Sequence, residues 1–282
     1  MRNDKKNPFF TNVGLFSTSY FLHRIQKESE YQETSEAKAL EIWTKMRDLW
    51  HEYGDRLSSK SVSESDTEKF WFDRILPLLG FSFISKTQLR SGGGKRQKFP
   101  DYTLYTSEQI AAESLRADVE HRFKRAICVF EGKKFGMDLD QLDVGSTDDD
   151  ESLPCVQLVQ YLKDAEIDWG ILSNGEVWQI FYRCGQYSAT RFFEFHLLNL
   201  LQHPKMPKEF VTFIHCFSKD AFISDCDGVR RLDRIYSQCQ RYGQDVGEPF
   251  FEGCAKALRL AFEEYQKSVG CQKDLQVSAQ CH

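Results

Sequence analysis

Two carboxylates and a lysine follow short apolar segments of this chain in an order that suits phosphodiester hydrolysis. Asp101 follows Pro100, and Glu131-Gly132-Lys133 comes thirty residues later. Cleavage of a phosphodiester builds negative charge on the phosphoryl oxygens, and Mg²⁺, which takes carboxylate oxygens and water as ligands, can neutralise that charge. On a strand, Glu131 and Lys133 would project to the same face, because side chains repeat every two residues. The spacing therefore predicts a metal-dependent phosphodiesterase, with Lys133 beside the metal and the attacking water.

The segments around both acidic positions are typical of β-strands. Residues 99–105 alternate and are rich in aromatic and β-branched side chains, and residues 125–130 form a short apolar run. Two adjacent strands would bring Asp101 and Glu131 together. Each fragment alone also fits an ordinary turn or a solvated strand end, since short motifs often match by chance. Residues 107–122 are expected to form an inserted helix, which leaves the pairing of the two strands open.

The following segment predicts a helix and then a hairpin. Residues 154–162 have amphipathic spacing, and Gln157 and Tyr161, four residues apart, share one helix face. An amide and a phenol on that face could contact a phosphate backbone, or could simply be half-buried. Asn174-Gly175 between two alternating segments indicates a β-hairpin that extends the sheet.

The order of these motifs resembles the PD-(D/E)xK nuclease superfamily. Within it, the chain is most similar to the N-terminal nuclease module of Type IIG restriction-modification enzymes, which is related to the nuclease domain of Type I restriction motor subunits. The resemblance covers about residues 10 to 265 and implies a restriction-endonuclease-like α/β core, in which helices flank a mixed β-sheet, with additional N- and C-terminal helical regions. It rests on Glu68 in a predicted helix, Pro100-Asp101, Glu131-Gly132-Lys133, the Gln157 and Tyr161 pair, and residues 168–178.

The resemblance also implies roles for individual residues. Asp101, the Glu131 side chain and the backbone carbonyl of Gly132 would bind Mg²⁺, for which Mn²⁺ could substitute, and Lys133 would orient or activate the water and stabilise the developing charge. Glu68 would support the metal through water, although an acid near a helix N-terminus also suits the helix dipole. The Gln157 and Tyr161 pair would contact the backbone of the DNA substrate.

Charge limits how this chain could bind DNA. Its net charge is −5, and nonspecific DNA affinity comes largely from lysines and arginines that displace counterions. A glycine-rich basic loop before Asp101 supplies candidate contacts at Lys95, Arg96 and Lys98, although a solvated hairpin loop would look the same. The chain has no Asn-Pro-Pro-Tyr motif and no glycine-rich cofactor loop. We therefore expect a methyltransferase or specificity region, absent from this chain, to supply base recognition.

Composition predicts a cytoplasmic protein with no membrane association. The nine cysteines are scattered without a Cys-x-x-Cys pair, which suits a reducing compartment. The weakly charged stretch 9–23 is interrupted by polar residues and is too short to span a bilayer. The predicted organisation is an N-terminal helical region at 1–62, a nuclease core at 63–196, a helical connector at 197–270 and a flexible tail at 271–282.

Three classes of function follow from these observations. The favoured one is a Mg²⁺-dependent DNA endonuclease module of a restriction-modification or phage-defence system. The alternative is a catalytically inactive nuclease-fold subunit that serves as a nucleic-acid-binding or protein-interaction scaffold, which the intact Asp101, Glu131 and Lys133 disfavour. An interaction protein built on the two helical flanks is the third.

Overall fold

The computed structural model of the 282-residue chain describes residues 7–87, 100–118, 121–140, 153–183, 185–242 and 258. The chain divides into two compact units, Met1–Tyr236 and Ser237–His282. The first unit contains the β-sheet and every labelled helix and strand named below. The flexible tail expected at 271–282 lies outside the described residues.

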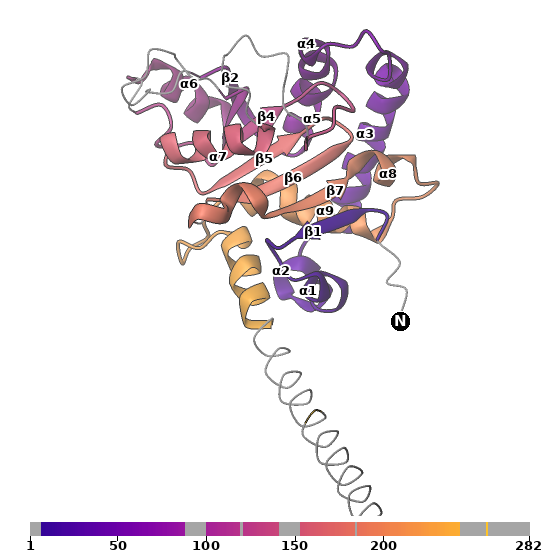
Figure 1. Cartoon of the computed structure of the whole chain (residues 1–282), viewed down its shortest axis with the longest axis vertical. Helices are drawn as coiled ribbons and strands as arrows, with labels where there is room; N and C mark the ends of the chain where they lie inside the picture. Colours follow the sequence, from indigo (N-terminus) through magenta and orange to yellow (C-terminus); the bar gives the residue numbers. More distant parts are fainter. Residues whose placement is uncertain are drawn as a thin grey trace, which may run out of the picture. The chain divides into compact units, whose positions relative to one another are not determined.

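A mixed seven-stranded sheet forms the centre of the first unit (Figure 1). Strands β4 and β5 run parallel, and all other neighbouring strands of this sheet run antiparallel. Helices flank the sheet, so the predicted α/β class with a mixed sheet is confirmed. The strands in spatial order are β1 (Phe10–Val13), β7 (Phe192–His196), β6 (Val177–Tyr182), β5 (Trp169–Ser173), β4 (Cys128–Gly132), β3 (Tyr102–Tyr105) and β2 (Ser82–Ser85).

The helical elements connect and cover these strands. The α-helices are α1 (Thr18–His23), α2 (Ser29–Gln32), α3 (Glu36–Leu57), α4 (Glu64–Thr67), α5 (Asp73–Leu78), α6 (Glu108–Arg116), α7 (Pro154–Asp164), α8 (Leu197–Gln202) and α9 (Lys208–Phe217). The short 3₁₀ segments are η1 (Ile25–Lys27), η3 (Gly185–Thr190) and η4 (Lys219–Ala221), and η2 (Glu68–Phe72) is a π-helical turn. A further helix begins at residue 231. Among the described helices, none combines the length and the apolar character that crossing a bilayer requires.

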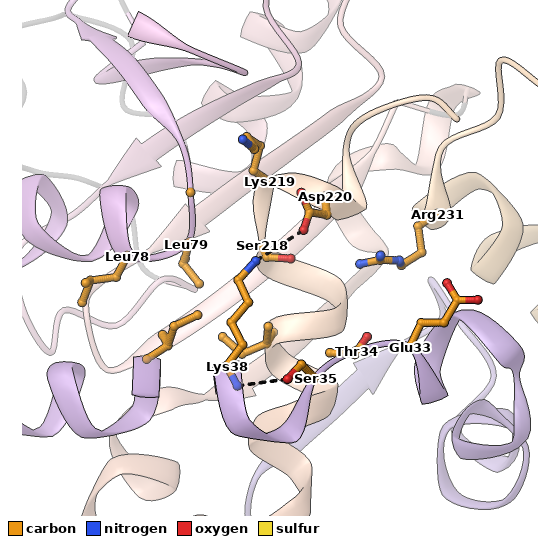
Figure 2. A pocket seen from close by; sticks show the side chains of 13 residues that line it. Glu33, Thr34, Ser35, Lys38, Leu78, Leu79, Ser218, Lys219, Asp220 and Arg231 are labelled. Atoms are coloured by element: carbon orange, nitrogen blue, oxygen red, sulfur yellow. Dashed lines mark hydrogen bonds and ion pairs between the residues drawn. The ribbon is translucent and has the colours of Figure 1, made fainter. Parts of the chain in front are cut away.

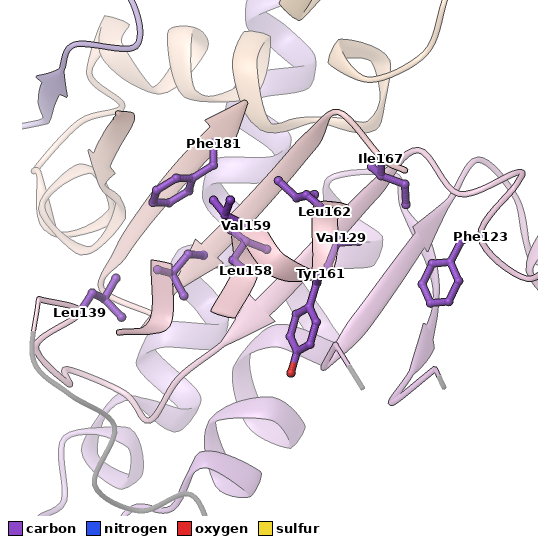
Figure 3. Packing of buried hydrophobic residues seen from close by; sticks show 10 residues of the cluster. Phe123, Val129, Leu139, Leu158, Val159, Tyr161, Leu162, Ile167 and Phe181 are labelled. Carbon is purple, nitrogen blue, oxygen red and sulfur yellow. The ribbon is translucent and has the colours of Figure 1, made fainter. Parts of the chain in front are cut away.

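Helices α7 and α9 cover opposite faces of the sheet. Phe181 belongs to the buried cluster beneath α7, whereas Trp178 contacts the rings of Phe213 and Phe217 on α9. Positions 178 and 181 of β6 point to opposite faces because strand side chains alternate. Figure 3 shows the α7 cluster, which includes Leu158 of the helix. Helix α7 links the parallel strands β4 and β5. Its packing on this face of the sheet therefore sets the position of the helix relative to the end of β4.

The local predictions around the strands are confirmed. Helix α6 begins after Ser107, whose side chain accepts a hydrogen bond from the N–H of Ile110, and it is the inserted helix expected between the two acidic strands. The hairpin between β5 and β6 turns at Asn174-Gly175. The Asn174 side chain accepts from two following N–H groups, and Gly175 has φ +88°.

The N-terminal region differs from the helical expectation because it also contributes a strand. Strand β1 pairs antiparallel with β7, far away in sequence. The ring of Phe10 lies 5.5 Å from that of Phe193 and 5.8 Å from that of Phe195. Burial of these aromatic side chains stabilises the pairing, which no local sequence pattern indicates.

Candidate active site

The pairing of β3 with β4 brings Asp101 and Glu131 together. Tyr102 lies opposite Phe130, so the residue before Tyr102 lies beside the residue after Phe130. The Asp101 N–H donates to Oε2 of Glu131 at 3.4 Å, and the Gly132 N–H donates to Oδ2 of Asp101 at 2.9 Å. Both acidic residues are buried. The two carboxylates therefore meet at one position, with backbone donors helping to hold them.

Lys133 reaches back over this pair. Its Nζ donates to Oε1 of Glu131 at 3.0 Å and to Oε1 of Gln157 at 3.1 Å. Its own N–H donates to the carbonyl of Ser173 on β5 at 2.8 Å, which continues the parallel ladder for one residue beyond the end of β4. Although Lys133 carries a charge, the residue is only 3% exposed. The lysine thus lies in a fixed place among carboxylates rather than at a solvated strand end.

Two glutamates on the helix before β2 complete the acidic group. Glu64, Glu68 and Asp101 each offer a carboxylate oxygen, and these oxygens lie within 4.8 Å of one another. Helix α4 begins at a capping box formed by Ser63 and Asp66. The helix then widens into the π-turn η2, in which the Asp73 N–H bonds to the Glu68 carbonyl. Such π-turns occur frequently at functional sites.

Glu64 is the residue that the sequence analysis missed. Its position four residues before Glu68 on one helix was the available signal, because residues with this spacing share a face. The sequence predicts metal binding by Asp101 and Glu131. In the structure Glu131 bonds to Lys133 and to the Asp101 N–H, and it lies beside the group that Glu64 and Glu68 form with Asp101.

Lys86 lies at the edge of the acidic group. Its N–H donates to the Asp101 carbonyl at 2.8 Å, and its Nζ lies 3.6 Å from Oε2 of Glu68. Its φ angle is +50°, a left-handed conformation that is uncommon for a residue other than glycine. Backbone strain of this kind tends to occur near functional sites. Lys86 is therefore a cation that already lies beside the carboxylates.

Close packing explains the glycine between Glu131 and Lys133. A Cβ atom on Gly132 would lie 2.7 Å from Cε2 of Phe72, well inside van der Waals contact. Phe72 is fully buried and packs edge-on against Phe130, with ring centroids 4.9 Å apart. The absence of a side chain at Gly132 thus lets the helix with Glu64 and Glu68 approach β4.

The electrostatic balance of the site favours bound cations. Burial, followed by the negative charges of Glu131 and Glu64, raises the pKa of Asp101 well above its usual range. Burial alone would lower the pKa of Lys133, but the charges of Glu131, Glu64 and Asp101 outweigh burial and raise it above the usual lysine value. Lys133 therefore stays protonated. A further positive charge near the carboxylates would stabilise their ionised form.

The donor set fits a hard divalent cation. Three carboxylates converge, one from α4, one from η2 and one from the residue before β3, and oxygen ligands of this kind suit Mg²⁺ or Mn²⁺. Among the acidic, histidine and cysteine side chains that the structure describes, Glu64, Glu68 and Asp101 are those that lie close enough together to share one ion. Asp101, Glu68 and Glu64 are thus the residues that would hold the cation, with Glu131 beside them.

The structure brings Gln157 and Tyr161 to the site, with Gln157 half-buried and Tyr161 buried. Gln157 Nε2 donates to the Tyr161 hydroxyl at 2.8 Å, and Gln157 Oε1 accepts from Lys133. The remaining predicted DNA contacts, Lys95, Arg96 and Lys98, lie outside the described residues.

A separate cavity of about 210 Å³ lies near the start of α3 (Figure 2). Of the predicted site residues that the structure describes, none lines it. Its Lys38 Nζ lies 3.8 Å from Asp220, and the Nζ of its Lys219 donates to the Thr106 carbonyl at 3.4 Å. Both lysines already have partners. This cavity therefore does not gather several charges of one sign, as the site does with the carboxylates around Asp101.

Comparisons of the chain with family models, with curated proteins and with solved structures give no match.

Proposed function

We propose that this chain is a Mg²⁺-dependent endodeoxyribonuclease with a restriction-endonuclease-like core of the PD-(D/E)xK type. The observation that carries the proposal is the convergence of Asp101, Glu131 and Lys133 at the ends of two paired strands, beside Glu64 and Glu68. Two buried carboxylates, Asp101 and Glu131, with the half-buried Glu64 and Glu68 beside them, surround one buried lysine, and this excess of negative charge is costly unless the group binds something positive. A structural core has no need of this arrangement, whereas phosphodiester hydrolysis does.

The reaction would be hydrolysis of a DNA phosphodiester. The oxygen of water forms a bond to phosphorus, one phosphorus–oxygen bond to a sugar breaks, the water loses a proton and the leaving oxygen gains one. A divalent cation held by Asp101, Glu68 and Glu64 would neutralise charge on the phosphoryl oxygens and favour ionisation of water.

Lys133 would act as a charged donor. Because its pKa is raised, its ammonium keeps its protons and is not the base that deprotonates water. It can instead donate hydrogen bonds to the attacking water or to a phosphoryl oxygen, which stabilises charge that develops in the transition state. Glu131 holds the ammonium in place through the 3.0 Å bond to its Oε1.

DNA and a recognition partner complete the proposal. We propose that the chain serves as the nuclease module of a restriction-modification or phage-defence system, together with a methyltransferase or specificity region. A net charge of −5 supports this arrangement, because such a chain neutralises few phosphates unaided. We therefore expect the isolated chain to cut DNA slowly and without sequence preference.

Plasmid nicking tests the proposal at low salt, where weak DNA binding is least limiting. Wild type, Lys133→Ala and Lys134→Ala are incubated with supercoiled DNA in Mg²⁺, in Mn²⁺ and in chelator. Lys134 is the adjacent lysine and serves as the matched control. We expect metal-dependent nicking by wild type and Lys134→Ala, and a loss of about a hundredfold or more in Lys133→Ala.

The same assay separates the scaffold alternative. A catalytically inactive subunit would bind DNA but nick it at no detectable rate with either metal. Nicking that continues in chelator, or that Lys133→Ala retains in full, would place the chemistry elsewhere.

A further inference from the structure

Gln157 lies between a lysine and a tyrosine, with both polar atoms of its side chain in use. Its Oε1 accepts from Lys133 Nζ at 3.1 Å, and its Nε2 donates to the Tyr161 hydroxyl at 2.8 Å. An amide that faces a phosphate would instead direct its N–H groups toward the substrate. The observed bonds run inward, toward Lys133.

Tyr161 is anchored by packing. It is 5% exposed and belongs to the cluster with Leu158 and Leu162 of α7 and Val129 of β4. Figure 3 shows its ring lying along this cluster, with the hydroxyl at the end farther from it. The hydroxyl is thereby held at a defined position one helical turn beyond Gln157, since residues four apart on a helix are neighbours.

The Lys133 ammonium selects which way the amide of Gln157 faces, and the Tyr161 hydroxyl holds the other end of the amide. If the amide rotated by half a turn, its NH₂ group would face the Lys133 ammonium, donor against donor, and its oxygen would lose the lysine. With the carbonyl oxygen directed at Lys133, Nε2 donates to the Tyr161 hydroxyl, which anchors the far end of the amide. A lysine side chain is long and has many rotamers, so the acceptor on Gln157, in addition to that on Glu131, narrows where its ammonium can lie.

We propose that Gln157, anchored by Tyr161, is a positioning residue that fixes the Lys133 ammonium beside Glu131 for the reaction. The inference rests on the proposed nuclease function for its catalytic consequence. It replaces the expectation that Gln157 and Tyr161 contact the DNA backbone. Both residues act through Lys133 and not on the substrate.

Substituting Gln157 in two ways separates the two roles. Gln157→Glu keeps an acceptor oxygen for Lys133, and Tyr161 can then donate to it, so a positioning role predicts more activity in Gln157→Glu than in Gln157→Ala. A phosphate contact predicts the opposite order, because the added negative charge repels DNA. For positioning, we expect Gln157→Ala to lower kcat about tenfold while KM changes less than about twofold.

The controls come from the same helix. Gln160 also pairs with a residue four positions on, its Nε2 donating to Asp164 at 2.7 Å on the exposed face. Gln160→Ala and Gln160→Glu should leave kcat and KM unchanged. Tyr161→Phe retains the ring that fills the cluster and removes only the hydroxyl, so it should fold and should lower kcat by a few-fold.

A readout without DNA keeps this inference separate from the nuclease proposal. In ¹⁵N-lysine-labelled protein with chelator, NMR measures proton exchange of the Lys133 ammonium, whose signal is assigned by its absence in Lys133→Arg. We expect Gln157→Ala and Tyr161→Phe to speed exchange by about fivefold or more, and Gln157→Glu to do so less. If wild type cuts no DNA, the nuclease proposal fails and this exchange rate alone decides the positioning role.

Two results would overturn the inference. One is unchanged ammonium exchange in both Gln157→Ala and Tyr161→Phe. The other is a Gln157→Glu variant that has a raised KM and is less active than Gln157→Ala. If Gln157→Ala does not fold, as judged by circular dichroism, the ammonium exchange of Tyr161→Phe and the activity and KM of Gln157→Glu relative to wild type distinguish the positioning role from a phosphate contact.

Discussion

Glu64 and Glu68 lie one helical turn apart and direct their carboxylates at the same place, within 4.8 Å of each other and of Asp101. Like charges at this spacing destabilise an isolated helix. The chain tolerates them where α4 passes into the π-turn η2, against the buried ends of β3 and β4. This local cost is the physical reason to expect that the group binds a cation.

Removing one helix carboxylate should weaken metal binding. We expect Glu64→Gln to bind Mn²⁺ about tenfold more weakly than wild type, because the variant loses one negative ligand atom but keeps its shape. Titration calorimetry measures the affinity. Glu209→Gln, a partly exposed glutamate in the first turn of α9, is the control and should match wild type. Equal affinity in Glu64→Gln would remove Glu64 from the ligand set.

Neutralising Lys86 should strengthen metal binding. Its ammonium lies 3.6 Å from Glu68, so it competes with a cation for the same carboxylate. Because Lys86 is 62% exposed, solvent screens the effect, and we expect Lys86→Gln to bind Mn²⁺ about two- to fivefold more tightly. Lys69→Gln, whose ammonium lies over the Phe70 ring, is the control. Weaker binding in Lys86→Gln would show that Lys86 supports the ion instead of competing with it.

A methyl group at Gly132 should destabilise the fold. The Cβ of Gly132→Ala would lie 2.7 Å from the Phe72 ring, and Phe72 is held by Phe130 and Trp178, so it cannot move aside at low cost. We expect a loss of about 1–3 kcal/mol in the free energy of unfolding, measured in urea. In a double-mutant cycle, Phe72→Leu should make the second substitution less costly. Additive losses would mean that the two positions do not touch.

Acid should destabilise the chain through His215. This residue is 1% exposed, and burial, with a smaller contribution from Arg231, lowers its pKa from 6.5 to about 3. The unfolded chain binds a proton below pH 6.5 that the folded chain excludes. The stability that neutral His215 contributes is therefore complete above that pH and is lost as the pH falls toward 3, by about 1.4 kcal/mol per pH unit.

His215→Gln tests this linkage. Glutamine can still bond to Thr34, whose Oγ1 lies 2.9 Å from Nδ1 of His215, but it does not titrate. Between pH 7 and pH 5, we expect the free energy of unfolding to fall about 2 kcal/mol less in the variant than in wild type. Parallel pH profiles for the two proteins would show that His215 is not the residue responsible.

The parts of the site that could be predicted from sequence depend on local patterns. An apolar run that ends in Glu131 and an alternating run that begins near Asp101 indicate strands, and the Asn174-Gly175 turn chemistry indicates the hairpin. These signals span a few residues each. They also indicate which side chains share a face, which is why Lys133 could be assigned to the side of Glu131.

The remaining features depend on contacts between distant segments. The pairing of β1 with β7 follows from burial of Phe10 against rings more than a hundred residues away. The inward bonds of Gln157 depend on how deeply Tyr161 packs, which a helical pattern does not reveal. The place of Glu64 in the acidic group depends on how close its helix approaches β4.

Metal-dependent cleavage by wild type and Asp101→Asn tests whether a cation bound at Asp101 supports hydrolysis of DNA. Plasmid nicking by the full chain is measured across a Mn²⁺ titration at low salt, and calorimetry on the same samples gives metal binding. We predict that the nicking rate of wild type saturates together with metal binding, and that Asp101→Asn loses both nicking and metal binding. Cleavage that persists in Asp101→Asn, or metal bound at Asp101 without any cleavage by wild type, would contradict it.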